Sequence, residues 1–158
     1  FLAVEHFGLT PDIVTLAKGL GGGLPIGACL TNEKTENVLG FGNHGSTFGA
    51  NPVCAAGARA VMKKVTDPQF LFSVTQKGAL LRARLSALNA VKSISGIGLM
   101  LGLELEGIDA KIAADRCFEK GLLVLTAKSV LRLMPPLSIS SEELNSGFKI
   151  LEDVLTCR

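Results

Sequence analysis

Lys18 is the residue whose position most suggests covalent chemistry. It follows the apolar run 12–17 and precedes glycines at 19, 21, 22 and 23. A strand that ends on a lysine and then turns through glycines places an amine at the strand's carboxyl edge, where ligands of α/β proteins gather. A lysine desolvated there can attack a carbonyl and form a Schiff base. Position alone favours the plainer alternative, a solvated lysine at the entrance to a loop.

A second glycine-rich passage, residues 40–49, carries the hydroxyls of Ser46 and Thr47. It leads into a helix start, because Asn51 is a typical N-cap residue and Pro52 suits the first helical position. Hydroxyls and free amides ahead of a helix N-terminus can bind an anion such as a phosphate. An ordinary capped helix explains the same residues, so both interpretations stand. The glycines after Lys18 complete neither the dinucleotide fingerprint nor a P-loop.

Arg132 lies within the otherwise apolar run 130–134. A guanidinium in such a strand either faces water or binds a carboxylate in a cleft through paired hydrogen bonds. Glu104 also interrupts an apolar strand, but Glu106 shares its face and indicates a solvated side. Arg132 is therefore a candidate for binding a carboxylate, with an exposed arginine as the alternative.

Metal sites and disulfides find little support in the sequence. The histidines and cysteines are scattered: His6, His44, Cys29, Cys54, Cys117 and Cys157. Because no C-x-x-C pair occurs and neither histidine has a second ligand nearby, we expect no zinc site and no disulfide framework. Cysteines without a framework fit a reducing compartment, either the cytoplasm, which we expect, or an organelle matrix.

Composition excludes several classes of partner. Of the 158 residues, 47% are hydrophobic and 19% charged, which is typical of a globular chain. Lysine and arginine number 16 against 14 acidic residues and form no cluster, so we expect no nucleic acid and no anionic membrane as partner. No apolar run reaches the roughly 18 residues that span a bilayer, and Glu5 stands where a signal peptide would be apolar.

The pattern along the chain predicts two units joined by a helix. Residues 1–66 contain the glycine passages, with strands expected at 12–17, which should be buried, and at 26–31. The helix that begins at Pro52 has an apolar stripe of Val53, Ala56, Ala60 and Val61. Residues 67–90 have the periodicity of one long amphipathic helix.

Residues 91–158 are predicted to form a small α+β domain. Leu101, Leu103 and Leu105 alternate with other residues, as expected of a half-buried strand. The remaining predicted elements are a helix over 109–120 that stops at Gly121, strands at 122–125 and 130–134, and a last helix opened by the capping box of Ser140 and Glu143.

These motifs resemble those of the class III aminotransferases, which are fold-type I pyridoxal-phosphate enzymes. The most specific stretch is LAKGLGGGLPIGA at residues 16–28. HGSTFGANP at 44–52, GLMLGLEL at 98–105 and LRLMPPL at 131–137 are also similar to family segments. The resemblance covers nearly the whole chain.

The resemblance implies a fold and a set of roles. The fold is α/β, with the end of the large domain, a mainly parallel sheet with helices, followed by the small domain. Lys18 would be the Schiff-base lysine of pyridoxal 5'-phosphate. Ser46 and Thr47 would bind the cofactor phosphate, Thr47 from the neighbouring subunit of a homodimer that shares its active sites. Arg132 would hold the substrate α-carboxylate.

The resemblance also implies substrates. Transamination of N-acetylornithine with 2-oxoglutarate, in arginine biosynthesis, is the first expectation, and ornithine or 4-aminobutyrate are the alternative donors. Because the chain begins with Phe1 and matches only the later part of the family, we expect a C-terminal part that is inactive alone. Upstream would lie the aspartate for the pyridine nitrogen, the main phosphate loop and the aromatic residue that stacks on the ring. A non-catalytic fragment or interaction module is the alternative from another class.

Three positions depart from the family pattern. Ala50 and Lys128 stand where the family usually has glycine, and Ser95 stands near a frequent arginine. A residue with a Cβ at position 50 is expected to restrict the turn. The departures bear on fine substrate positioning.

Overall fold

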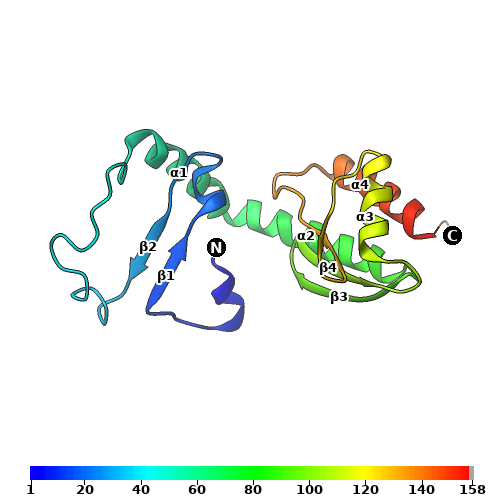
Figure 1. Cartoon of the computed structure of the whole chain (residues 1–158), viewed down its shortest axis with the longest axis horizontal. Helices are drawn as coiled ribbons and strands as arrows, with labels where there is room; N and C mark the ends of the chain where they lie inside the picture. Colours follow the sequence, from blue (N-terminus) through cyan, green and yellow to red (C-terminus); the bar gives the residue numbers. More distant parts are fainter. Residues whose placement is uncertain (157–158) are drawn as a thin grey trace. The chain divides into compact units, whose positions relative to one another are not determined.

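The computed structural model of the chain describes residues 1–156. Two compact units can be distinguished, one spanning Phe1–Leu71 and the other beginning at Phe72 (Figure 1). The boundary falls inside helix α2 (Pro68–Ser86), which lies within the helix predicted over 67–90. The division into 1–66, 67–90 and 91–158 remains a prediction. No described helix is long and apolar enough to cross a membrane.

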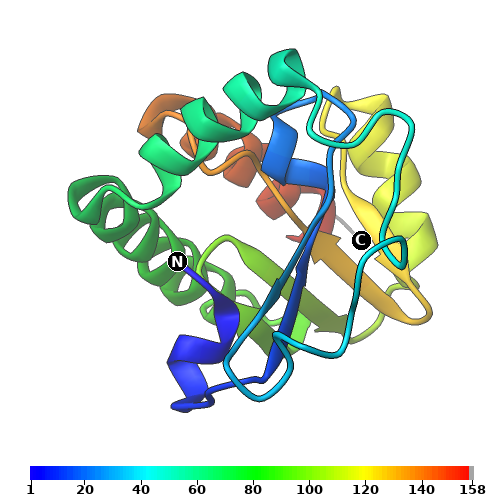
Figure 2. The same ribbon diagram turned by 90° about the vertical axis from the view of Figure 1, so that its left-hand side faces the viewer.

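Unit 1 is built around one pair of strands and one helix. Its elements are the 3-10 helix η1 (Ala3–Phe7), strand β1 (Ile13–Leu16), the 3-10 helix η2 (Lys18–Gly21), strand β2 (Ala28–Thr31) and helix α1 (Pro52–Val65). β1 and β2 pair in antiparallel register, with Leu16 opposite Ala28. Between β2 and α1 the chain forms neither helix nor strand (Figure 2).

The pairing of β1 with β2 differs from the expected mainly parallel sheet. A parallel neighbour is reached through a crossover, usually an α-helix, whereas residues 17–27 between Leu16 and Ala28 contain only the 3-10 helix η2 and glycine turns. The expected burial of strand 12–17 is also wrong, since Ile13 is 54% exposed. A strand is buried only when layers cover both of its faces, and among the described residues β1 pairs only with β2.

Helix α1 begins where predicted, but the face that it buries differs from the predicted one. The Asn51 side chain accepts hydrogen bonds from the amides of Val53 and Cys54, at 3.0 and 3.2 Å, which confirms the N-cap. The predicted apolar stripe is wrong at Val53, Ala56 and Ala60, which are exposed, and Cys54 is the buried residue. Of the stripe, only Val61 faces the glycine loop after Lys18, together with the small Gly57.

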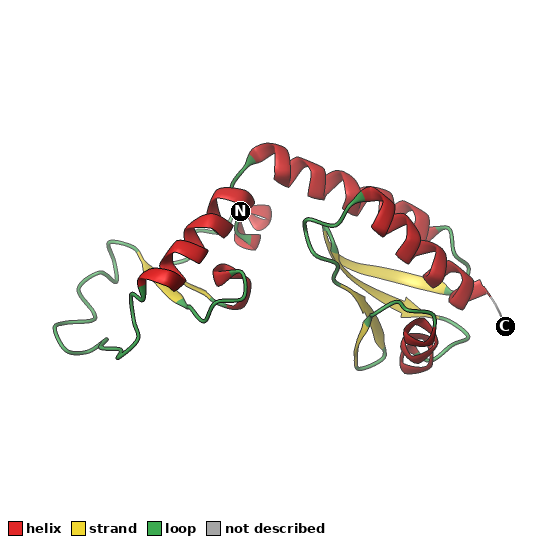
Figure 3. Cartoon of the chain, turned by 90° about the horizontal axis from the view of Figure 1, so that it is seen from above, coloured by secondary structure: helices red, strands yellow, loops and turns green. Residues whose placement is uncertain are grey.

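Unit 2 consists of a four-stranded antiparallel sheet and three helices (Figure 3). The strands lie in the order β3-β4-β6-β5, so β3 and β5 form the edges. The bounds are β3 (Val91–Ile97), β4 (Met100–Leu105), α3 (Ala110–Glu119), β5 (Leu125–Ala127), β6 (Val130–Leu133) and α4 (Ser141–Thr156).

The core of unit 2 lies on one face of this sheet. Leu101, Leu103 and Leu131 point to that face and are at most 2% exposed. Helices α2 and α4 run side by side (Figure 3), joined by Arg84, which hydrogen bonds to Asn145 and lies over the Phe148 ring. The alternation predicted for 101–105 is therefore confirmed for its buried leucines.

Predictions of helix ends in unit 2 are confirmed, and one strand is displaced. The Glu143 amide donates to Ser140 Oγ at 3.1 Å while the Ser140 amide donates to the Glu143 carboxylate at 2.8 Å, forming the predicted capping box. The strand predicted at 122–125 is wrong except at Leu125, because β5 runs to Ala127. Pairing with β6 decides this, and it begins where the tight turn after Ala127 brings the two strands together.

Candidate active site

Lys18 is the first residue of the turn that follows β1. Its φ of +53° lies in the left-handed region, which costs a non-glycine residue free energy and persists only where the surroundings enforce it. The turn is held by hydrogen bonds from Leu20 to Ala17 and from Gly22 to Gly19, at 3.1 and 3.2 Å. The side chain of Lys18 is exposed, so the described residues do not supply the desolvation that a nucleophilic lysine requires.

Ser46 and Thr47 lie in a tight turn just before α1. The turn is closed by the Gly49 amide, which donates to the Ser46 carbonyl at 3.3 Å. Both side chains are exposed, and within residues 1–156 neither makes a hydrogen bond. The amides at the start of α1 are occupied by Asn51, so the helix start is capped by its own side chain. An anion here would be bound by the two hydroxyls rather than by the amides that Asn51 occupies.

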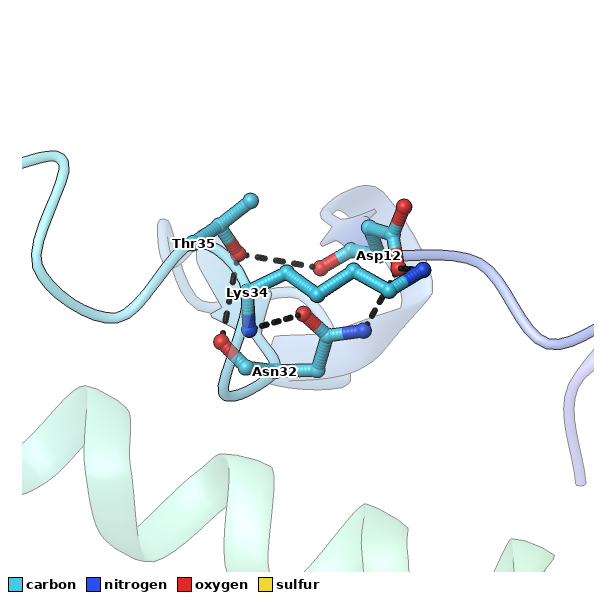
Figure 4. A network of polar contacts seen from close by, with 4 residues as sticks. All are labelled: Asp12, Asn32, Lys34 and Thr35. Carbon is cyan, nitrogen blue, oxygen red and sulfur yellow. Dashed lines mark hydrogen bonds and ion pairs between the residues drawn. The ribbon is translucent and has the colours of Figure 1, made fainter.

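A polar cluster that the sequence patterns did not indicate joins the two strands at the open end of the β1–β2 pair (Figure 4). Asp12 Oδ1 accepts hydrogen bonds from Asn32 Nδ2 at 2.6 Å and from Lys34 Nζ at 3.0 Å. The hydroxyl of Thr35 donates to the Asp12 carbonyl. The hydrogen bond from Asn32, and then the one from Lys34, lower the pKa of Asp12. The cluster holds β1 at its start, and Lys18 follows the other end of the same strand.

Arg132 lies on the half-exposed face of the sheet of unit 2. Strand register places it opposite Gly102, which in turn lies opposite Ser95, so the three form one row across β6, β4 and β3. Its guanidinium donates to Met134 Sδ at 2.9 Å. No carboxylate in the described part of the chain pairs with Arg132. The side chain is thus free for an external carboxylate.

Glu104, in contrast, is already paired. Its carboxylate accepts hydrogen bonds from Lys92 Nζ at 3.0 Å and from Ser93 Oγ at 2.9 Å. These contacts, that with Lys92 first, lower the pKa of Glu104. Its role is to join β3 to β4, which agrees with the solvated side expected from Glu106.

Comparison with known proteins identifies the family. The family model described as aminotransferase class III matches residues 1–155. The chain belongs to the class III aminotransferases. An acetylornithine aminotransferase of Haemophilus ducreyi is 52% identical over 155 residues, which cover 98% of this chain and 39% of that protein.

Solved class III structures share the fold. The acetylornithine aminotransferase of Elizabethkingia anophelis is 32% identical with a TM-score of 0.86, over 98% of this chain and 43% of its own. An ornithine aminotransferase of Toxoplasma gondii is 31% identical with a TM-score of 0.87, over 98% of this chain and 38% of its own. The chain therefore spans about two fifths of the class III proteins that it matches.

Two departures from the class III pattern fall on strained backbone. Ala50 and Lys128 have φ values of +56° and +55°, and with Lys18 they are the non-glycine residues at positive φ in the described chain. The glycine usual at both positions adopts this conformation freely. The expectation that a Cβ at position 50 restricts the turn fits this geometry. At the third departure, Ser95 Oγ donates to the Gly102 carbonyl at 3.3 Å.

Proposed function

We propose that the chain is the C-terminal part of a pyridoxal-phosphate-dependent aminotransferase in which Lys18 is the catalytic residue. The observation that carries this proposal is the place of Lys18, which opens the glycine turn at the end of β1 within the family segment 16–28. Its left-handed φ is an enforced geometry of the kind that gathers at active sites.

The polar groups of unit 1 fit pyridoxal phosphate chemically. The amine of Lys18 suits the cofactor's aldehyde, and the hydroxyls of Ser46 and Thr47 suit its phosphate. None of the three side chains has a hydrogen bond or ion pair within the described residues, so all are available. When bound, the cofactor supplies a ring that accepts the electron pair released as a C–H bond of the amino donor breaks.

Lys18 then transfers protons, and Arg132 binds the substrate. The free Nζ of Lys18 takes the proton from the carbon that bears the donor's amino group, and later returns a proton as an acid. Arg132 binds the donor's α-carboxylate through its two-pronged guanidinium and thereby orients that carbon. Its lack of a carboxylate partner among residues 1–156 supports this role.

We assign the amino donor as N-acetylornithine and the acceptor as 2-oxoglutarate, which places the reaction in arginine biosynthesis. The naming of the Haemophilus relative as an acetylornithine aminotransferase supports this order. The ornithine aminotransferase of Toxoplasma gondii, similar at a TM-score of 0.87, supports ornithine as the second candidate donor. The complete enzyme acts as a cytoplasmic homodimer that shares its active sites.

A scaffold or interaction role is the second candidate function. Unit 1 exposes large apolar side chains, among them Phe41, Phe48 and Phe7 at 108%, 84% and 66%. Such surface is typical of a face that another polypeptide covers. A chain that only binds another polypeptide through this apolar surface needs no reactive lysine.

Selective chemistry at Lys18 separates the two functions. Residues 1–158 are joined to the part of the Haemophilus ducreyi relative that they do not match, because the upstream part of the cofactor site is needed for selectivity. This chimaera is mixed with pyridoxal phosphate, whose aldehyde condenses with an amine to form a C=N bond and one molecule of water. Borohydride then delivers hydride to the carbon and leaves a stable secondary amine. Peptide mass spectrometry is expected to find Lys18 labelled well ahead of the exposed Lys149, and Lys18→Ala to abolish the main adduct. Equal labelling of the two lysines contradicts the proposal.

Donor choice requires the whole fold. The same chimaera is assayed with each donor and 2-oxoglutarate. We expect a higher kcat/KM for N-acetylornithine than for ornithine. The reverse order assigns ornithine instead. A folded chimaera that binds cofactor but turns over neither donor supports the scaffold role.

A further inference from the structure

Helix α1 touches the turn after Lys18 closely at Gly57, where an added side chain would displace the loop's neighbouring atoms. A Cβ added to Gly57 would lie 2.5 Å from Leu24 Cδ1 and 3.2 Å from the Gly21 carbonyl oxygen. Leu24 is 36% exposed, so its side chain can turn away from the new methyl group but then leaves its place against α1. The Gly21 carbonyl would have to shift by a few tenths of an ångström, because the second distance is shorter than van der Waals contact. Leu24 therefore sits in a notch that Gly57 opens in the helix surface.

One helical turn further on, α1 meets the same loop again. A Cβ on Gly22 would lie 2.9 Å from Val61 Cγ2, and Gly22 itself has a φ of +61°. Gly57 and Val61 are four residues apart and lie on the same face of α1. Two contacts on one face prevent the loop from sliding along the helix or rotating about a single point.

These contacts continue to Lys18 through the backbone. Leu24 donates its amide to Gly21, Gly22 to Gly19 and Leu20 to Ala17, each at 3.1–3.2 Å. The loop from Ala17 to Leu24 is thus a series of turns linked by backbone hydrogen bonds. Its first turn residue is Lys18, whose left-handed backbone requires such outside support.

We propose that Gly57 is a positioning residue for Lys18, acting through Leu24 and the glycine loop. This role rests on the proposed function of Lys18. Since the turn that contains Ser46 and Thr47 leads within a few residues into α1, the notch sets the place of the Lys18 loop against the helix that follows those hydroxyls.

The test is Gly57→Ala in the chimaera with the Haemophilus relative, examined by the trapping of pyridoxal phosphate with borohydride. The readout is the ratio of adduct at Lys18 to adduct at Lys149, so that each molecule contains its own reference. Alanine normally stabilises a helix interior relative to glycine, so a general helix effect would not lower the ratio. A misplaced reactive group loses on the order of ten- to a hundredfold, and we expect a fall of about tenfold or more.

Gly78→Ala is the matched control. Gly78 lies in α2, where an added Cβ would meet the Gly98 carbonyl oxygen at 2.5 Å. The chemical change is the same and the crowding is more severe, since the three nearest atoms are all backbone atoms of Gly98, but the affected turn joins β3 to β4 in unit 2. The ratio at Lys18 is expected to stay unchanged in this variant.

A double variant tests whether the effect of Gly57→Ala is transmitted through Leu24. Adding Leu24→Ala to Gly57→Ala removes the side-chain atom that lies closest to the new methyl group. The double variant is expected to return to within about twofold of Leu24→Ala alone, because the two residues are coupled. Circular dichroism follows folding, and a double variant that folds without recovering the ratio overturns the proposal.

The outcomes separate the two claims. If Lys18 in the chimaera without further substitutions is labelled no better than Lys149, the proposed function fails and the positioning role fails with it. If Lys18 is labelled selectively and Gly57→Ala leaves the ratio unchanged, only the positioning role fails. A fall in Gly57→Ala with full rescue and an unchanged Gly78→Ala supports it.

Discussion

The side-chain amide of Asn32 donates a hydrogen bond of 2.6 Å to the carboxylate of Asp12, across the open end of the β1–β2 pair. Lys34 adds an ion pair at 3.0 Å to the same oxygen. β1 runs from this cluster to Lys18, so the cluster and the glycine loop hold the strand at opposite ends.

The stability of unit 1 is expected to fall at acid pH through Asp12. Because its pKa is lowered in the folded chain, the ionised carboxylate stabilises folding above its ordinary pKa. That contribution is lost as the pH falls through the lowered value. Asn32→Ala should raise the pKa of Asp12, read by NMR titration of the carboxyl carbon. Asn37→Ala is the matched control, and an unmoved titration in Asn32→Ala contradicts the prediction.

Arg82 is expected to protect an edge of the sheet in unit 2. Its guanidinium donates to the carbonyls of Ile94 and Gly96 at 2.9 and 2.6 Å, on the outer side of edge strand β3. Arg82→Ala should cost about 1–3 kcal/mol of unfolding free energy, measured in urea, and leave carbonyls that can pair with another chain. Arg82→Lys retains the charge but not the two-pronged geometry. Full stability and no added light scattering in both variants would contradict this role.

Glycine at the strained departures should stabilise the chain. Ala50→Gly and Lys128→Gly remove the cost of a Cβ at positive φ but add freedom to the unfolded chain. The net gain is expected to be about 0.5–1 kcal/mol for each. Ala60→Gly, in the exposed middle of α1, makes the same kind of change with the opposite expected sign, a loss of about 1 kcal/mol. Urea unfolding measures all three, and a loss at position 50 would show that its turn is unstrained.

Local signals in the sequence predict helix ends well. Asn51 before Pro52 and Ser140 with Glu143 form the caps that their residue types indicate, because a cap depends on atoms within a few positions of the chain. The motif around Lys18 is equally local, since the glycines that follow it permit the tight loop.

Features that depend on distant contacts could not be predicted in this way. The inward face of α1 is selected by the loop against which it lies, so the small Gly57 faces inward and the larger Val53 does not. The start of β5 is decided by its pairing with β6. The sequence shows that Ala50 stands at a usual glycine position, but only its φ of +56° shows that the backbone there is strained.

Arg132→Gln is expected to weaken donor binding more than it slows chemistry. The substitution keeps a polar side chain on β6 but loses the charge that an α-carboxylate requires. In the chimaera with the Haemophilus relative, KM for the donor should rise about 10- to 100-fold, with a smaller change in kcat. Lys92→Gln, which removes a cation already paired with Glu104, is the control. An unchanged KM in Arg132→Gln would leave the arginine with no substrate role.

Thr47 is expected to bind the cofactor phosphate of the neighbouring subunit. Within residues 1–156 its hydroxyl has no partner, and the dimer proposal supplies one across the interface. Loss of one hydrogen bond to a dianion should weaken cofactor affinity about 10- to 100-fold. The measurement uses a mixed dimer of the chimaera, with Lys18→Ala in one subunit and Thr47→Ala in the other. The one site that retains Lys18 then receives its threonine from the partner and should bind cofactor with unchanged affinity. Weak binding there, equal to that of the Thr47→Ala homodimer, would place the threonine in its own subunit's site.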